Sequence, residues 1–301
     1  MIDISEKIET LRTAIAESRV LARQETIARA ERGETPKGDV LDVARAAGVM
    51  AAKKTWELIP YCHPLPLDYV GIRYELGDGK IIIRTEVRTV GKTGVEMEAL
   101  TAASVTALTI YDMLKGIDKE VVIGETRLLE KHGGKSDFKE EFLKPLCAAV
   151  LVTSDGVSSG KKEDKSGRII AEEVQKFPVT VRHYEVVPDD KTEIRRKLLG
   201  WTEEGIDLIL TTGGTGLGPR DLTVETVREL IEREVPGIAE AIRSYGQRRT
   251  PYAMLSRGVV GVRGKTLLIT LPGSSRGVKE SIAAVFPNAL HIFNMMKGGG
   301  H

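Results

Sequence analysis

The sequence predicts two domains, the first mixing helices with a β-hairpin and the second an α/β domain with a doubly wound, mostly parallel sheet. With 301 residues the chain exceeds the roughly 100–200 residues of one domain. Strand and helix patterns alternate regularly only in the second half. Between the halves, glycines, charges and a proline replace the periodic apolar residues. We therefore expect domains at 1–137 and 147–301, joined by a linker at 138–146.

Composition excludes several classes of protein. The formal net charge of +1 and the scattered Lys and Arg residues argue against a nucleic-acid partner. No apolar run approaches the roughly 20 residues of a membrane span, and the charged first 20 residues contain no signal-peptide core. Cys62 and Cys147 lie far apart, so no zinc motif or disulfide framework is encoded. We expect a cytoplasmic protein with no membrane partner, no zinc and no haem.

The first half contains one segment with helical periodicity and one with the alternation of a β-hairpin. Ile4, Ile8, Leu11 and Ile15 recur at helical spacing, which predicts an amphipathic helix extending to about Ala30. Residues 69–90 instead read VGIRYEL, Gly-Asp-Gly and KIIIRTEVRTV. Two alternating runs around a glycine turn indicate a β-hairpin with one buried face.

Residues 37–67 concentrate lysines, prolines and a histidine. Apolar residues recur there at three- and four-residue steps, which predicts a helix with Asp39 as its N-cap: Val40, Val43, Ala44, Ala47 and Ala51. Pro60, Pro64 and Pro66 then make a stiff turn that presents His63. Lysines around a small-residue helix with a histidine suit a phosphate-rich anion. The plainer alternative is a packed histidine and lysines that complement the helix dipole.

Residues 94–115 return to a helical pattern, in which Asp112 and Lys115 share one face. The two form either a surface ion pair or an acid/base pair. Glu98 lies on nearly the same face as Asp112, but the two are roughly 21 Å apart at about 1.5 Å per residue. One compact substrate cannot reach both along one helix, so we expect a site shared between subunits.

These stretches, together with GKTGVEMEALTAASVTALTIYDMLK at 91–115 and LLEKHGGKS at 128–136, resemble the MoaC-type cyclic pyranopterin monophosphate synthases of molybdenum cofactor biosynthesis. The resemblance covers residues 1–137. It implies an α+β ferredoxin-like domain, an oligomer with sites at its interfaces, and rearrangement of 3′,8-cyclo-7,8-dihydroguanosine triphosphate with loss of pyrophosphate.

The same resemblance implies roles for individual residues. The positions that would hold the triphosphate and the departing pyrophosphate are Lys37, Lys53 and His63. Asp112 and Lys115 would be the acid/base couple, and Lys131, in the 128–136 loop, is a further family position. Glu96 and Glu98 would shape the pocket or bind magnesium, with a purely structural role equally open.

The second half contains four apolar runs that predict strands: 148–153, 179–187, 208–212 and 266–271. Helical patterns between them predict the doubly wound sheet, and such sheets bind ligands at the carboxyl ends of their strands. Glycine-containing polar loops follow three of the strands: 154–167, 211–223 and 271–277. Their backbone amides and the helices that follow suit a phosphate, although glycines can serve tight turns alone.

These loops and TPYAMLSRGVVGVRGKTLLITLPG at 250–273 resemble the MogA/MoaB-type molybdopterin adenylyltransferases over residues 147–298. The resemblance implies transfer of AMP from magnesium-bound ATP, a co-substrate, to molybdopterin, with Mg²⁺ as cofactor. The first loop would contribute Asp155, Ser159, Asp164 and Ser166. The phosphate cradle would comprise Gly213, Gly214, Thr215 and Gly216. Apart from the resemblance, Arg220 and Asp221 behind these glycines offer a phosphate-binding cation and a magnesium-type carboxylate.

Asp221 and Asp189 are the acidic positions that the resemblance assigns to nucleotide and metal, and Asp221 would bind Mg²⁺. Ser274 and Ser275 would face the molybdopterin phosphate. Many members of this family carry an X-Pro pair after LPG, whereas this chain has Ser274-Ser275-Arg276. This departure leaves open whether the second half adenylates or only binds pterin.

The leading hypothesis is a bifunctional enzyme of molybdenum cofactor assembly, acting on nucleotide and pterin small molecules. The alternative is a scaffold whose second domain only carries molybdopterin. A third reading, a general nucleotide-binding or phosphohydrolase protein, predicts turnover of ordinary GTP or ATP without any pterin. The resemblances imply a homohexamer built as a trimer of dimers for the first half and a homotrimer for the second. The two are compatible because both contain a threefold axis.

Overall fold

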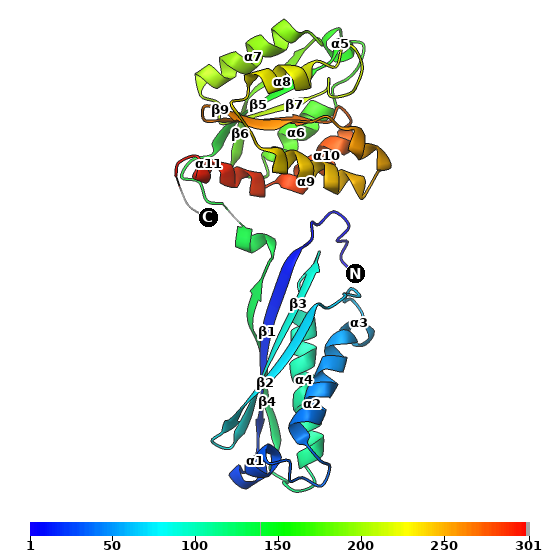
Figure 1. The fold of residues 1–301 in the computed structure, drawn as a ribbon, viewed down its shortest axis with the longest axis vertical. Coiled ribbons are helices and arrows are strands. Elements are labelled where there is room, and N and C mark those ends of the chain that lie inside the picture. The colour runs from blue at the N-terminus through cyan, green and yellow to red at the C-terminus, as the bar shows by residue number, and fades with distance from the viewer. Residues whose placement is uncertain (139, 299–301) are drawn as a thin grey trace. The chain divides into compact units, whose positions relative to one another are not determined.

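The structure is a computed structural model that describes residues 1–138 and 140–298. The chain forms two compact units, Met1–Asp137 and Phe138–His301 (Figure 1). Residue 139 of the expected linker and residues 299–301 lie outside the described residues. Among the described residues, no helix combines the length and the apolar character needed to cross a membrane.

Unit 1 is a four-stranded antiparallel sheet covered on one face by two helices. Its elements in chain order are β1 (Thr10–Leu21), α1 (Gln24–Glu31), α2 (Val40–Lys53), α3 (Thr55–Leu58), β2 (Tyr69–Gly77), β3 (Lys80–Gly91), α4 (Glu96–Leu114), β4 (Val122–His132) and the 3₁₀ helix η1 (Lys135–Phe138). The strand order is β2-β3-β1-β4. Helices α2 and α4 lie side by side against the sheet (Figure 1).

The predicted N-terminal helix is wrong: residues 10–21 form the central strand β1. Even-numbered residues of β1 point into the core, where Ala14, Ala16 and Val20 are fully buried. Leu11, which the helical pattern had placed inside, is 57% exposed. β1 pairs with β3 along its whole length and with β4 on its other side. Pairing on both edges, which no local pattern reveals, overrides the apparent helical spacing.

The helix predicted from residue 40 is confirmed as α2, whose N-terminus is capped by the Asp39 side chain accepting from the Asp42 amide. Its buried face differs slightly from the predicted one, because Val43 is exposed and Gly48 is buried. A Cβ at Gly48 would lie 2.1 Å from Thr106 Oγ1 of α4. Glycine is therefore required for the close approach of the two helices. The hairpin predicted at 69–90 is confirmed by β2 and β3.

Unit 2 is a six-stranded mixed sheet between two layers of helices. Its elements are β5 (Leu146–Thr153), α5 (Asp155–Ser158), α6 (Ser166–Val174), β6 (Val179–Val187), α7 (Lys191–Glu204), β7 (Leu208–Thr212), α8 (Thr223–Leu230), β8 (Arg233–Glu234), α9 (Pro236–Gln247), η2 (Pro251–Leu255), β9 (Val260–Arg263), β10 (Thr266–Leu271), α10 (Ser275–Val285), η3 (Asn288–His291) and α11 (Ile292–Met295). The strand order is β6-β5-β7-β10-β9-β8.

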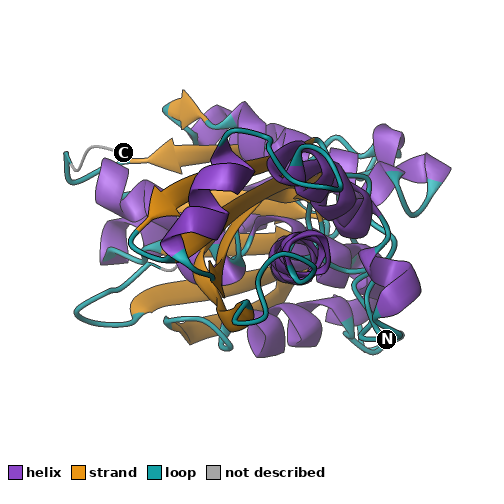
Figure 2. Cartoon of the chain, turned by 90° about the horizontal axis from the view of Figure 1, so that it is seen from below, coloured by secondary structure: helices purple, strands orange, loops and turns teal. Residues whose placement is uncertain are grey.

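All four strands predicted in the second half are confirmed, and they form the parallel part of the sheet. β9 and β8 continue it as antiparallel strands. Helices α7 and α8 cover one face, and α6, α9 and α10 the other (Figure 1). The strands are visibly twisted rather than flat (Figure 2), as expected of packed sheets. This arrangement brings the carboxyl ends of β5, β6, β7 and β10 to one edge.

Candidate functional sites

In unit 1, Lys37 and Lys115 converge on Asp112 near the end of α4. Lys37 Nζ lies 2.6 Å from Asp112 Oδ2 and donates to the Asp112 carbonyl at 3.0 Å. Lys115 Nζ lies 2.6 Å from Asp112 Oδ1. Lys37 precedes α2 and Lys115 caps α4, so the packing of these two helices brings the cluster together. The predicted Asp112–Lys115 pair is confirmed as an ion pair, with both side chains about half exposed.

The cluster changes the proton affinities of its members. Hydrogen bonds from Lys115 and Lys37 lower the pKa of Asp112 to about 2. The hydrogen bond to Asp112, together with its charge, raises the pKa of Lys115. The contact with Asp112 therefore favours the protonated, charged form of Lys115 in the free chain.

The remaining predicted residues of unit 1 lie at the opposite end of the helix pair. Lys53 is the last residue of α2, roughly 21 Å along the helix from its start at about 1.5 Å per residue. The ring of His63 is within 3.0 Å of the Ile2 carbonyl through Nε2. Lys131 Nζ pairs with Glu96 at 3.5 Å. Lys131 belongs to strand β4, which corrects the expectation that it lies in a loop.

Glu98 and Cys62 belong to this same end. Glu98 is 4% exposed, and burial raises its pKa. Burial, followed by the nearby Glu98 charge, also raises the pKa of the Cys62 thiol. The proline-rich turn therefore packs near the start of α4. Within one chain, the structure separates Lys37, Asp112 and Lys115 from the residues around His63.

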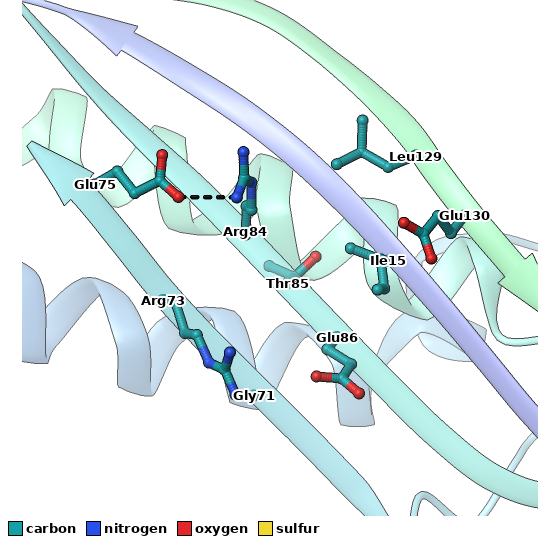
Figure 3. A pocket seen from close by; sticks show the side chains of 9 residues that line it. All are labelled: Ile15, Gly71, Arg73, Glu75, Arg84, Thr85, Glu86, Leu129 and Glu130. Atoms are coloured by element: carbon teal, nitrogen blue, oxygen red, sulfur yellow. Dashed lines mark hydrogen bonds and ion pairs between the residues drawn. The ribbon is translucent and has the colours of Figure 1, made fainter.

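The outer face of the unit 1 sheet carries a charged surface that the sequence analysis missed. Glu17, with 5% of its side chain exposed, pairs with Arg19, Arg84 and Arg127 at 2.9, 3.3 and 3.4 Å. Burial alone would raise the pKa of Glu17, but these arginines hold it below its usual value. Figure 3 shows the adjacent pocket, which is lined by Ile15, Gly71, Arg73, Glu75, Arg84, Thr85, Glu86, Leu129 and Glu130. Only the alternation of β1, once recognised as a strand, could have revealed this face.

In unit 2, the loops after β5, β6, β7 and β10 meet at one edge of the sheet. Thr212 Oγ1, at the end of β7, donates to the Pro272 carbonyl after β10 at 2.7 Å. Thr153 and Thr223 hydroxyls lie 2.8 Å apart. Gly213 has φ +93°, and a Cβ there would lie 2.1 Å from the Thr153 carbonyl oxygen. Only glycine fits this turn, which aims the following backbone at the open edge.

Two aspartates and an arginine from three of these loops are joined. Arg220 clamps Asp155 with Nε–Oδ2 at 2.6 Å and Nη2–Oδ1 at 2.8 Å. Asp155 and Asp189 accept hydrogen bonds from each other's backbone amides at 3.1 and 3.0 Å. Hydrogen bonds from Arg220 lower the pKa of Asp155. Burial, together with the charges of Asp155 and Asp221, raises the pKa of Asp189.

The other predicted residues of the first loop mostly organise the loop itself. The Ser159 hydroxyl donates to the Asp155 carbonyl at 2.6 Å. Asp164, which is 8% exposed, accepts from the Gly167 amide at 2.9 Å, from Ser166 at 3.4 Å and from the Tyr184 hydroxyl. Tyr184 was not predicted, because its partner is fixed only by the parallel pairing of β5 and β6.

The glycine-rich loop is held by Asp221 and by an arginine that the sequence analysis did not single out. Asp221 Oδ2 accepts from the Gly218 amide at 2.7 Å. Arg257 donates to the Gly216 carbonyl at 2.8 Å, to the Asp221 carbonyl at 3.1 Å, and to Glu225. Gly214 has φ +59°, and Thr215 follows it, partly buried. Arg257 was within the quoted 250–273 motif, but only the fold shows its target.

The loop after β10 begins helix α10. The Ser274 hydroxyl caps this helix by accepting from the Gly277 amide at 3.2 Å, and Ser275 is its first residue. A Cβ at Gly273 would lie 3.5 Å from Gly213 Cα, so this loop adjoins the glycine-rich one. A helix N-terminus of this length suits an anionic group.

Asp189 and Asp221, the two aspartates predicted to bind nucleotide and metal, both belong to this edge of the sheet. Among residues 1–138 and 140–298, no group of three or more His, Cys, Asp or Glu residues could hold a metal by itself. Mg²⁺ commonly uses only one or two carboxylates and takes its other ligands from substrate phosphates and water. Asp189 Oδ1 is buried and has no hydrogen-bond partner. An unsatisfied carboxylate oxygen near Asp221 fits a cation that arrives with its substrate.

Comparisons with known proteins agree with the two-part structure. Residues 1–134 match the MoaC family, and residues 149–291 match a family described as a probable molybdopterin binding domain. The chain is 45% identical over its whole length to a molybdenum cofactor biosynthesis bifunctional protein of Chlorobaculum tepidum, covering 96% of that protein. It is 39% identical to the protein of the same name in Synechococcus elongatus, covering all of this chain and 98% of that one.

The halves also have separate relatives. A cyclic pyranopterin monophosphate synthase of Brevibacillus brevis is 58% identical over 45% of this chain and 86% of its own length. The MoaB crystal structure from Thermus thermophilus is 47% identical over 51% of this chain and 97% of its own, with a TM-score of 0.49. Because the full-length identities span both units, the chain belongs to the family of bifunctional molybdenum cofactor biosynthesis proteins.

Proposed function

We propose that the chain catalyses two non-consecutive reactions of molybdenum cofactor assembly, one in each unit. The observation that carries this proposal is the 45% identity to a bifunctional protein along the entire chain, combined with a charged cluster in each unit. Both reactions release pyrophosphate from a nucleotide, and both clusters contain cations suited to phosphate.

Unit 1 would convert 3′,8-cyclo-7,8-dihydroguanosine triphosphate into cyclic pyranopterin monophosphate. Its βαββαβ element order and antiparallel sheet support a ferredoxin-like fold. Lys115 would donate a proton near the purine-derived ring, and Asp112 would keep it protonated until the substrate binds. Lys53, His63 and Lys131 would hold the triphosphate and the departing pyrophosphate. Glu96 and Glu98 would shape this end of the site.

The unit 1 site would be completed by a second subunit. Lys37, Asp112 and Lys115 lie at one end of the α2–α4 pair, and Lys53 and His63 at the other. A substrate that needs both groups would have to receive one of them from another copy of the chain. A trimer of dimers, or a trimer, would supply such contacts.

Unit 2 would transfer AMP from ATP to the terminal phosphate of molybdopterin. The amides of residues 213–216 would hold the nucleotide phosphates, and the Ser274–Ser275 helix start would face the pterin phosphate. Asp221 and Asp189 would hold Mg²⁺, whose chemistry is to neutralise charge on the ATP phosphates. Arg220 would add a cation for the leaving pyrophosphate.

The test is an assay of the purified full-length chain with molybdopterin, ATP and magnesium. We expect adenylated molybdopterin and stoichiometric pyrophosphate. Binding of molybdopterin without release of pyrophosphate would instead support the scaffold, and would assign the loss to the Ser274–Ser275 loop. Hydrolysis of ATP or GTP without pterin would support a general phosphohydrolase.

A further inference from the structure

The Arg220 side chain places a positive charge against Asp155 and the Asp189 carbonyl at the unit 2 site. Its guanidinium grips both oxygens of Asp155 and reaches the Asp189 carbonyl at 3.3 Å. Asp155 and Asp189 are locked together through their backbone amides. The arginine therefore neutralises the most negative part of the site while the nucleotide is absent.

Two features make this contact easy to break. Arg220 is 65% exposed and Asp155 47% exposed, and ion pairs this open to water contribute only about 0–1 kcal/mol. The loop that carries Arg220 is also held independently of this contact. Arg257 donates to the Gly216 and Asp221 carbonyls, so the loop can stay in place while Arg220 turns.

We infer that Arg220 is an internal counter-ion that a divalent cation must displace, and that the displaced guanidinium then binds the nucleotide phosphates. This inference rests on the proposed adenylyl-transfer function and specifies the order of binding. A free divalent cation at Asp189 and Asp221 meets the positive charge of Arg220, whose guanidinium lies 3.3 Å from the Asp189 carbonyl oxygen. A cation carried by a triphosphate brings with it a stronger, bidentate partner that draws Arg220 away.

The inference predicts effects of opposite sign for one substitution. In full-length Arg220→Gln, Mn²⁺ alone should bind about two- to fivefold more tightly, which corresponds to loss of an exposed ion pair. The complex of Mn²⁺ with α,β-methylene-ATP should bind roughly ten- to a hundredfold more weakly, because a charged hydrogen bond to phosphate is lost. Mn²⁺ binding is measured by electron paramagnetic resonance, and nucleotide binding by calorimetry.

Arg196→Gln is the matched control, because Arg196 is an exposed arginine of unit 2 that pairs with Glu193 within α7. It makes the same change in net charge and should alter neither affinity. Arg220→Lys keeps the positive charge but loses the planar guanidinium that can bind a phosphate with two hydrogen bonds. Its Mn²⁺ affinity should therefore be near the wild-type value, whereas its nucleotide affinity should remain low.

Unchanged or weaker Mn²⁺ binding by Arg220→Gln, in a chain whose melting temperature matches the wild type, would overturn the inference and leave the proposed function standing. Failure of the wild-type chain to bind α,β-methylene-ATP with Mn²⁺ would instead overturn the proposed function and this inference with it. If Arg196→Gln also bound Mn²⁺ more tightly, the change in net charge alone would explain the effect, and the inference would be rejected.

Discussion

The charged clusters of the two units differ in how the fold assembles them. In unit 2, aspartates and glycines from four separate loops meet at one sheet edge within a single chain. In unit 1, two helices gather Lys37, Asp112 and Lys115 at one end and leave His63 at the other. A parallel sheet collects loops at one edge, whereas a helix pair distributes its residues along its length. From this difference we propose that a second subunit completes the unit 1 site, whereas the described residues of unit 2 gather their site within one chain.

Asp112→Asn and Asp221→Ala should have the largest effects on activity, each confined to one unit. Asp112→Asn, like Lys115→Ala, should lower the first reaction by a factor of about 10² or more, because it disrupts an acid/base couple. Asp221→Ala should lower the second by a similar factor and leave the first unchanged. Both rates are measured on the same full-length preparations. Loss of both activities in either variant would point to an assembly defect.

Arg257→Gln should have a smaller effect, confined to unit 2. The substitution removes hydrogen bonds to the Gly216 and Asp221 carbonyls and to Glu225. Misplacing the glycine-rich loop should lower adenylyl transfer by about 10- to 100-fold. Arg263→Gln, which removes an arginine bonded to the Leu230 carbonyl, is the control and should retain activity. Equal losses in the two variants would mean that Arg257 acts only through general stability.

Asp118→Asn should destabilise unit 1 without changing unit 2. Asp118, which is 1% exposed, accepts from the Arg23 and Glu120 amides and from the Thr26 hydroxyl. An asparagine cannot accept all of these, so we expect a loss of about 2–4 kcal/mol in the free energy of unfolding. Hydrogen exchange by mass spectrometry should show faster exchange in unit 1 peptides only. Glu57→Gln, at an exposed pair with Lys54, is the control.

The same variant predicts a pH dependence. Burial opposes ionisation of Asp118, but its hydrogen bonds outweigh burial and lower its pKa to about 2. A carboxyl whose pKa is depressed on folding stabilises the fold above its unfolded pKa, about 3.9, and loses this contribution as the pH falls towards 2. The stability gap between wild type and Asp118→Asn should therefore be full at pH 6 and shrink below pH 4. A gap that is constant down to pH 2.5 would contradict the ionic account.

The smallest expected effect concerns the pH profile of the first reaction. The hydrogen bond that Lys115 donates to the Asp112 carboxylate raises the pKa of Lys115, so the ammonium persists to higher pH than in an isolated lysine. Residual activity of Asp112→Asn should therefore lose its alkaline limb at lower pH than wild-type activity. Lys37→Gln removes the other partner of Asp112 and leaves the Lys115 contact in place, so its alkaline limb should move less. An alkaline limb that stays in place in Asp112→Asn would exclude Lys115 as the proton donor.

The sequence was most informative where local pattern and fold agree. The strands at 179–187, 208–212 and 266–271 were predicted to the residue, because apolar runs bounded by glycine-rich loops have few alternatives in an α/β chain. β1 was missed because its burial alternates through alanines and a serine, which give a weak apolar signal, while exposed Leu11 gave a false one. Partners set by the fold, such as Arg257 and Tyr184, carry no local signal at all.

Within the candidate sites, motif resemblance identified residues but not their grouping. Asp112 and Lys115 could be paired from their spacing on one helix, whereas the contact with Lys37 depends on how α2 packs against α4. The contact between Arg220 and Asp155 joins residues 65 positions apart. It can form only because the strand order of the sheet brings their two loops together. The division of the unit 1 residues between two helix ends likewise follows from packing.

Mixing inactive variants tests most directly whether the unit 1 site is shared between subunits while the unit 2 site lies within one chain. Full-length Lys115→Ala and His63→Ala chains, each inactive in the first reaction, are unfolded, mixed and refolded together, as are Asp155→Asn and Asp221→Ala chains for the second reaction. We predict that the first pair regains activity, because mixed oligomers contain sites with an intact group from each chain, and that the second pair does not. Recovery by neither pair, or by both, would contradict a shared site in unit 1 and a self-contained one in unit 2.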